Sequence, residues 1–290
     1  MIEAEGHLDR LPKGGAPRLR AHLAGVALTS PDPRRLAGFY MDAMGYRGEW
    51  HGDVWTGSLA GRRLSIRPGS ANSVDHSIFA LPDPLHLADL RGRLVSEKVG
   101  VGDIFDTLLS GPAIELADPD GNRLVFGVAA DAPATDAPDF PRLQHIVFAS
   151  DEAGRMVRFY CDVLGFAPSD YVSDEADDLT SAFLRCSPEH HSIAVFRAPR
   201  KRLDHLCYDV ADWTAIRDWA DRFADRRITL RWGPGRHGPG NNLFFFVNDP
   251  DGNWIEFSTE LELVKGPRET KLWIHEERTL NSWGTAFLRS

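Results

Sequence analysis

Apolar and polar positions along the chain repeat in a pattern of one short strand followed by one amphipathic helix. Residues 25–46 and residues 145–166 carry this pattern at a constant offset of 120 residues, without a gap. Each begins as an alternating apolar strand, reaches a turn rich in Asp, Pro or Gly, and continues with apolar residues at helical spacing. We interpret those helical positions as core packing: Leu36, Phe39, Tyr40 and Met44 in one copy, and Met156, Phe159, Tyr160 and Leu164 in the other.

A second pair of segments is also duplicated. Residues 74–79 match residues 203–208, and the motif DPDGN recurs at 118–122 and 249–253. Asp-Gly-Asn between two apolar runs predicts a hairpin turn. Each half of the chain therefore carries two units of a strand, a helix and further strands. The Pro/Ala/Asp-rich stretch at 131–138 separates the halves and is typical of a linker.

Three polar side chains interrupt apolar strands in the second half, namely His145, His205 and Glu256. Burying such groups costs free energy unless each finds a partner or a ligand. Two histidines and one carboxylate on separate strands are the parts of a facial triad, a ligand set that suits Fe(II) or Mn(II). The duplication supplies an internal control, because the equivalent residues of the first half are Gly25, His76 and Val125. Only the second half can assemble the triad.

Composition narrows the class of protein. The length of 290 residues suits two ordinary domains or one large domain, and the net charge of −9 argues against nucleic acid as a partner. The chain has three cysteines, and none forms a CxxC pair, which argues against a disulfide framework and fits the reducing cytoplasm. No apolar run has the length of a membrane span, so we expect no membrane association. The first twenty residues lack the apolar stretch of a signal peptide.

The duplicated units and the His-His-Glu set resemble the vicinal oxygen chelate superfamily, and within it the type I extradiol ring-cleaving dioxygenases. The resemblance covers residues 22–262 and implies an α+β fold of four βαβββ modules that form two open barrels. It divides the chain into an N-terminal tail (1–20), a barrel without metal (21–130), a linker (131–139), a catalytic barrel (140–262) and a C-terminal tail (263–290). The metal would be Fe(II), with Mn(II) as the alternative, bound by His145, His205 and Glu256.

Two further motifs resemble sequence motifs of the homoprotocatechuate and catechol 2,3-dioxygenases. Residues 183–196 resemble the strand that carries a catalytic histidine, which the match assigns to His191. His190 would point away, because neighbouring residues on a strand face opposite sides. Residues 233–238 resemble the segment that supplies a second active-site histidine, here His237. The family usually has a tyrosine ten residues before the metal glutamate, where this chain has Phe246.

The resemblance implies a reaction in which both atoms of dioxygen enter a catechol-type diol and the ring opens beside the hydroxyls. We expect Phe183, Arg236, Asn241 and Phe246 to contact the substrate, although a solvated surface position for Arg236 is an equal alternative. The tail from residue 263 would either cover the barrel mouth or pack between the subunits of a homo-oligomer.

Two other functions fit the same superfamily. One is a glyoxalase-like isomerase or transferase, which also uses histidine and glutamate ligands. The other is a small-molecule-binding protein that keeps the barrel and has lost the metal. The three intact ligands together with His191 and His237 favour oxygen chemistry, and the metal content of the purified protein separates an enzyme from a binding protein.

Overall fold

The computed structural model describes residues 6–106, 109–129 and 140–286. Each quarter of the chain has the order strand, helix and three strands. The first unit contains β1 (His22–Ser30), α1 (Pro33–Asp42), β2 (Arg47–His51), β3 (Val54–Leu59) and β4 (Arg62–Pro68). The second contains β5 (Ser73–Leu81), α2 (Pro84–Ser96), β6 (Gly102–Ile104), β7 (Leu109–Ala117) and β8 (Arg123–Ala129).

The second half repeats this order. Its first unit contains β9 (Arg142–Ser150), α3 (Ala153–Arg158), which continues as a π-helical turn (Phe159–Leu164), β10 (Ala167–Ser173), β11 (Leu179–Arg185) and β12 (Ile193–Arg197). The other contains β13 (Arg202–Asp209), α4 (Trp213–Asp225), β14 (Trp232–Arg236), β15 (Leu243–Asn248) and β16 (Trp254–Thr259). A short 3₁₀ helix (Leu8–Arg10) precedes these units, and β17 (Lys271–Ile274) and α5 (Glu277–Leu280) follow them.

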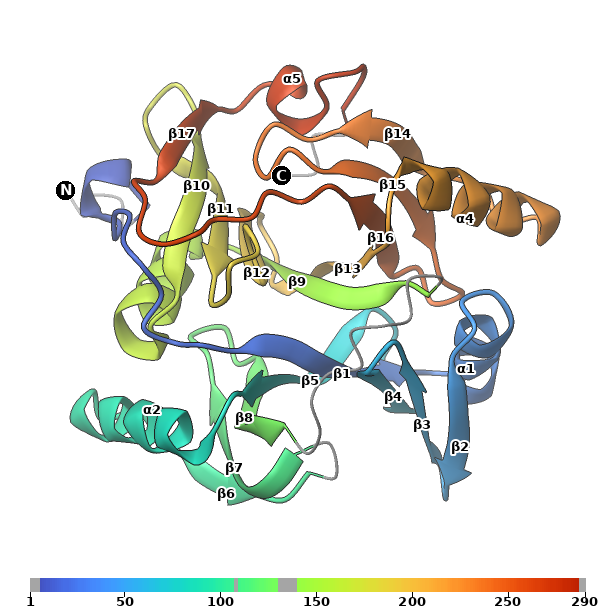
Figure 1. Ribbon diagram of the computed structural model, residues 1–290, viewed down its shortest axis with the longest axis horizontal. Coiled ribbons are helices and arrows are strands. Elements are labelled where there is room, and N and C mark those ends of the chain that lie inside the picture. The colour runs from blue at the N-terminus through green and yellow to red at the C-terminus, as the bar shows by residue number, and fades with distance from the viewer. Residues whose placement is uncertain (1–5, 107–108, 130–139, 287–290) are drawn as a thin grey trace.

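Each half forms one curved mixed sheet (Figure 1). The strand order is β2-β3-β4-β1-β5-β8-β7-β6 in the first sheet and β14-β15-β16-β13-β9-β12-β11-β10-β17 in the second. In both, the first strands of two units pair antiparallel at the centre, β1 with β5 and β9 with β13. The α+β fold of four βαβββ modules is therefore confirmed. The boundaries of the domains stay a prediction, and the linker at 131–139 lies outside the described residues.

The duplicated DPDGN motifs connect the two halves at equivalent places. In each motif the first aspartate side chain accepts hydrogen bonds from the backbone of the turn, which fixes a tight hairpin. The same carboxylate also accepts a hydroxyl from the helix of the opposite half. Tyr160 donates to Asp118 at 2.9 Å, and Tyr40 donates to Asp249 at 3.1 Å. The apolar core is continuous across this seam.

The C-terminal segment returns to the second sheet after the last module. Its strand β17 pairs parallel with β10 and forms the edge of the sheet, and α5 follows it across the top of the barrel (Figure 1). Within the described residues, no helix is long and apolar enough to cross a membrane.

Candidate metal centre

The register of three neighbouring strands brings the predicted triad onto one face of the second sheet. Cys207 on β13 lies opposite His145 on β9 and beside Glu256 on β16. His205 is two residues before Cys207 on the same strand, so its side chain faces the same side. The sheet thus gathers residues that are 111 positions apart in the sequence, from 145 to 256.

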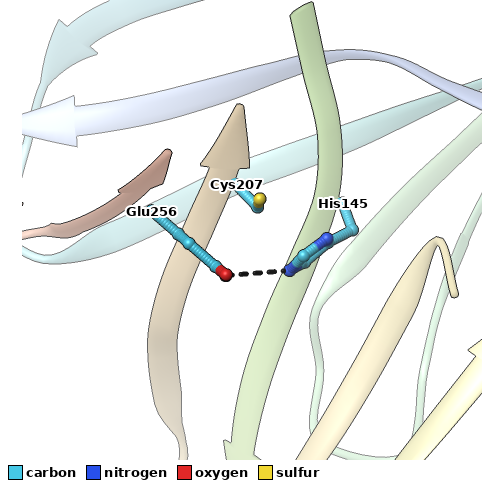
Figure 2. Close-up of side chains that lie close together, drawn as sticks. All are labelled: His145, Cys207 and Glu256. Atoms are coloured by element: carbon cyan, nitrogen blue, oxygen red, sulfur yellow. Dashed lines mark ion pairs between the residues drawn. The ribbon is translucent and has the colours of Figure 1, made fainter. Parts of the chain in front are cut away.

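The two histidines converge on one carboxylate oxygen. Glu256 Oε2 lies 3.4 Å from His145 Nε2 and 3.2 Å from His205 Nε2, and all three side chains are at most 5% exposed. Figure 2 shows Glu256 and His145 pointing toward each other, with Cys207 beside them. Burial would raise the pKa of Glu256, but its contacts with His145, His205 and His237 hold that pKa well below its usual range. The carboxylate is therefore ionised.

The residue before each histidine binds the other ring nitrogen. His145 Nδ1 lies 2.5 Å from Gln144 Oε1, and His205 Nδ1 lies 2.8 Å from Asp204 Oδ1. Both partners are oxygen acceptors, so the Nδ1 atoms carry protons and the Nε2 atoms are the nitrogens left to bind a metal beside Glu256. This second contact is the usual way in which proteins orient histidines that bind a metal. The donor set therefore fits a divalent iron or manganese ion held by two nitrogens and one oxygen.

Cys207 is a further group at this centre. Its sulfur and ligand atoms of His145 and Glu256 lie within 4.8 Å of one another. Burial raises the pKa of the Cys207 thiol well above its ordinary value, and the nearby carboxylate of Glu256 raises it further. A protonated thiol is a poor ligand, because the thiolate is the form that binds metals. His205 is the better third ligand, since its Nε2 is already directed at Glu256.

A cavity opens beside the triad, and its wall is largely aromatic. Its apolar side chains include Phe183, Phe196, Trp232 and Phe246. Phe246 lies opposite Glu256 in the strand register, and its ring meets that of His205 edge-on at 5.3 Å. The C-terminal segment contributes His275, Thr279 and Leu280 to the same wall. The segment therefore forms part of the cavity wall, and its predicted role as a cover of the barrel mouth or as a subunit contact stays a prediction.

The two predicted catalytic histidines both line the cavity. The His191 ring lies 4.1 Å from that of His145, and burial lowers the pKa of His191 well below its ordinary value. His237 Nε2 lies 3.4 Å from Glu256 Oε1, while His237 Nδ1 lies 2.5 Å from the Leu280 carbonyl oxygen. His237 also stacks on Phe244 at 3.7 Å. One nitrogen of His237 is thus anchored and the other faces the triad.

One prediction about this region is wrong. His190 and His191 do not alternate along a strand, because both lie in the connection between β11 and β12. The two side chains do diverge, but they stay in contact, with the Nδ1 atoms 3.0 Å apart. His190 points away from the cavity, as predicted, and is fully buried against Asp170.

Two of the predicted substrate contacts lie elsewhere. Arg236 donates to the Asn241 carbonyl and pairs with Glu260 at 2.7 Å, and neither Arg236 nor Asn241 lines the cavity. The next residue, Asn242, does line it and donates to Glu256 Oε1 at 3.1 Å. Asn241 has a positive φ of 56°, so this turn directs its side chain away from the strand face.

Sequence reasoning missed two arginines and the residues that orient the histidines. Arg197 and Arg202 lie at the cavity wall, where Arg197 pairs with Asp174 at 2.7 Å and Arg202 with Asp204 at 3.0 Å. The duplication contains a signal for Asp204. The residues of the first half that correspond to Asp204 and His205 are Asp75 and His76, and their side chains also contact each other, at 2.7 Å. In that half, small and apolar residues such as Ala24, Ile78 and Val125 pack together on the sheet.

Comparison with known proteins gives the family. The sequence profile of the Glyoxalase/Bleomycin resistance protein/Dioxygenase superfamily matches residues 142–257. The chain is 31% identical over 226 residues to a biphenyl-2,3-diol 1,2-dioxygenase of Pseudomonas sp. (strain KKS102), which covers 71% of this chain and 75% of that protein. It is 28% identical over 249 residues to an iron-dependent extradiol dioxygenase of Rhodococcus jostii (strain RHA1), covering 78% and 82%.

A third relative is longer than this chain. Metapyrocatechase 2 of Cupriavidus necator is 29% identical over 210 residues, which are 72% of this chain but 62% of that protein. The chain therefore spans less than two thirds of this relative's length.

Solved structures share the fold over nearly the whole chain. A substrate complex of homoprotocatechuate 2,3-dioxygenase from Brevibacterium fuscum superposes with a TM-score of 0.81 at 20% identity, covering 93% of this chain and 91% of the other. A Mn(II)-bound glyoxalase from Novosphingobium aromaticivorans gives a TM-score of 0.77 at 25% identity with the same coverage. From its fold and its relatives, the chain belongs to the glyoxalase/bleomycin resistance/dioxygenase superfamily, among its extradiol dioxygenases.

Proposed function

We propose that this protein is a metal-dependent extradiol dioxygenase, which inserts both atoms of dioxygen into an aromatic diol and opens the ring beside the hydroxyls. The observation that carries the proposal is the convergence of His145 Nε2 and His205 Nε2 on Glu256 Oε2, at 3.4 and 3.2 Å. His191 and His237 face the same cavity. The names of the relatives describe the same reaction class.

The metal would be held by His145, His205 and Glu256. Fe(II) is the first choice because one relative is named as iron-dependent, and Mn(II) is the alternative because a solved structure of the same fold is Mn(II)-bound. When bound, such an ion supplies neighbouring open positions for the two oxygens of a diol and for dioxygen, and makes the diol more acidic. Asp204 and Gln144 keep the Nε2 lone pairs of the histidines available for it.

His191 would move protons during the reaction. Its Nδ1 faces His190, which leaves Nε2 for the cavity. Burial disfavours its charged form, so at neutral pH it is a neutral imidazole that accepts a proton from a diol hydroxyl. It can return that proton to an oxygen when the O–O bond breaks.

His237 would position the diol. Its Nδ1 donates to the Leu280 carbonyl oxygen, so Nε2 is the nitrogen left to face the reacting oxygens. The aromatic wall of Phe183, Phe196, Trp232 and Phe246 excludes water and suits a flat ring. The arginines at the wall are each paired with a carboxylate, so this surface supplies little uncompensated positive charge.

The substrate would be a small aromatic diol. A catechol fits the reaction class, and Phe246 lacks the hydroxyl that a tyrosine would offer to it. Assembly as a homo-oligomer and a cytoplasmic location stay predictions from the sequence.

The test is anaerobic reconstitution with Fe(II), followed by aerobic addition of a panel of catechols. Oxygen uptake together with a yellow ring-fission product is the expected result, and His145→Ala should abolish both. His76→Ala is the matched control, because it removes the equivalent histidine of the first half. Tight metal binding by the wild-type protein with no oxygen uptake on any diol would refute the proposed reaction.

A further inference from the structure

A buried chain of polar groups leads away from His191 on the side opposite the cavity. His191 Nδ1 lies 3.0 Å from His190 Nδ1, and His190 Nε2 lies 3.1 Å from Asp170 Oδ1. His190 and Asp170 are both fully buried, and neither belongs to the metal triad. None of these contacts involves solvent, so each proton in the chain must be assigned between the groups themselves.

Asp170 meets three nitrogen-bearing side chains from different parts of the chain, of which Arg268 and Trp273 donate hydrogen bonds to it. Arg268 Nη2 and His190 Nε2 both reach Oδ1, and Trp273 Nε1 donates to Oδ2 at 2.7 Å. An ionised carboxylate can accept from all three, whereas an amide has one acceptor oxygen and two hydrogens of its own. The position therefore requires aspartate in its ionised form.

The carboxylate decides where the protons lie on the two histidines. His190 Nε2 forms no well-aligned hydrogen bond among the described residues, and it lies 3.1 Å from the negative Oδ1 of Asp170, where a bare lone pair would be repelled. Electrostatics therefore places a proton on Nε2. A neutral His190 then has an acceptor at Nδ1, and the contact at 3.0 Å requires that His191 Nδ1 be the donor.

We propose that Asp170 and His190 are positioning residues, which fix His191 in the tautomer that carries its proton on Nδ1 and presents a bare Nε2 to the diol. This inference rests on the proposed function, since it explains how His191 is ready to accept a proton. It is the logic by which a buried carboxylate holds a catalytic imidazole in one tautomer, here with a second imidazole between them.

The C-terminal segment completes the arrangement. Arg268 and Trp273 both follow the last module, and Trp273 lies on β17, which runs beside the strand of Asp170 (Figure 1). Arg268 Nη1 also pairs with Glu262 at 2.7 Å, and the Glu262 carbonyl accepts from the His190 backbone at 2.9 Å. Docking of the C-terminal segment is therefore linked to the orientation of His191.

Two substitutions of His190 separate this role from simple packing. His190→Asn places an amide near the former Nδ1 and can still accept from His191. His190→Gln places its amide near the former Nε2 and keeps the contact with Asp170, but leaves His191 Nδ1 without an acceptor. We expect kcat to fall by about 10- to 100-fold in the Gln variant and by less than about threefold in the Asn variant, a range typical of residues behind a metal site. Metal content and the KM for the diol should not change.

The second measurement needs no turnover. In metal-free protein labelled with ¹⁵N-histidine, NMR should show the His191 proton on Nδ1 in the wild type and in His190→Asn, and a mixture of tautomers in His190→Gln. A wild-type proton on Nε2, or equal kcat in the two variants, would overturn the inference. Because this spectrum is independent of ring cleavage, it still tests the positioning if the proposed reaction fails.

A milder variant tests the same positioning role if neither His190 variant folds. Trp273→Phe keeps an aromatic ring on β17 and removes only the donor to Asp170 Oδ2. We expect kcat to fall several-fold at constant KM, with a second tautomer of His191 appearing in the spectrum. An unchanged kcat together with an unchanged spectrum would overturn the link between the C-terminal segment and His191.

Discussion

Replacing Asp204 by asparagine tests how the metal centre is supported. Asp204 is buried, and its two oxygens accept from His205 Nδ1 at 2.8 Å and from Arg202 Nη1 at 3.0 Å. Burial lowers the pKa of His205, but Asp204 and Glu256 outweigh burial and raise it above its ordinary value. Asparagine removes the charge and retains one acceptor oxygen for two donors, so either the imidazole or the guanidinium loses its partner.

The size of the effect follows from that contact. A hydrogen bond to a charged group contributes about 1.5–3 kcal/mol, and loss of a group behind a ligand histidine typically weakens metal binding by about 10- to 100-fold. The two estimates agree, because 100-fold corresponds to about 2.7 kcal/mol. We therefore expect the Kd for Mn(II) to rise by about 10- to 100-fold in Asp204→Asn.

The duplication offers a matched control for this measurement. Asp75 contacts His76 Nδ1 at 2.7 Å, so Asp75→Asn makes the same change at the equivalent place of the half without a triad. Calorimetric titration of metal-free protein with Mn(II) gives the Kd of both variants. Equal Kd values for Asp204→Asn and the wild type, or an equal loss in Asp75→Asn, would show that the contact does not support the metal.

Three further predictions concern catalysis and stability. His191→Ala should keep the metal and lose about 10²- to 10⁴-fold in kcat, because it removes the proposed proton acceptor; steady-state oxygen uptake on the metal-loaded variant measures this. Chelation of a metal present at about 100 times its Kd should lower the free energy of unfolding by about 2.7 kcal/mol, visible as a lower Tm that added Fe(II) restores. Burial raises the pKa of Asp249 to about 6, so the folded state holds this proton more tightly than the unfolded chain and stability falls as the pH rises from about 4 through 6. The Tyr40 hydroxyl donates to Asp249, and this hydrogen bond is stronger when the carboxylate is ionised. In urea unfolding, Tyr40→Phe should therefore lower the free energy of unfolding by about 1.5–3 kcal/mol at pH 8 and by less at pH 5. An equal decrease at both pH values would contradict the raised pKa of Asp249.

Local patterns in the sequence determined the fold and the centre of the site. Alternation and helical spacing gave four equivalent units, because the periods of strands and helices are visible over ten residues. His145, His205 and Glu256 stood out as polar residues in apolar strands, where burial requires a partner. The duplication sharpened this interpretation, since Gly25 and Val125 occupy two of the three equivalent positions in the other half.

Contacts that depend on register or on distant segments were decided only by the tertiary structure. Asn241 and Asn242 are neighbours in sequence, yet only Asn242 reaches Glu256, because a turn with positive φ redirects the first of them. His190 lies in a connection instead of a strand, and its partner Asp170 is twenty residues away. Trp273 joins the same buried group from beyond the last module. The local periodicity of the sequence does not predict such contacts, because they form only when strands far apart in the chain pair and bury their polar groups together.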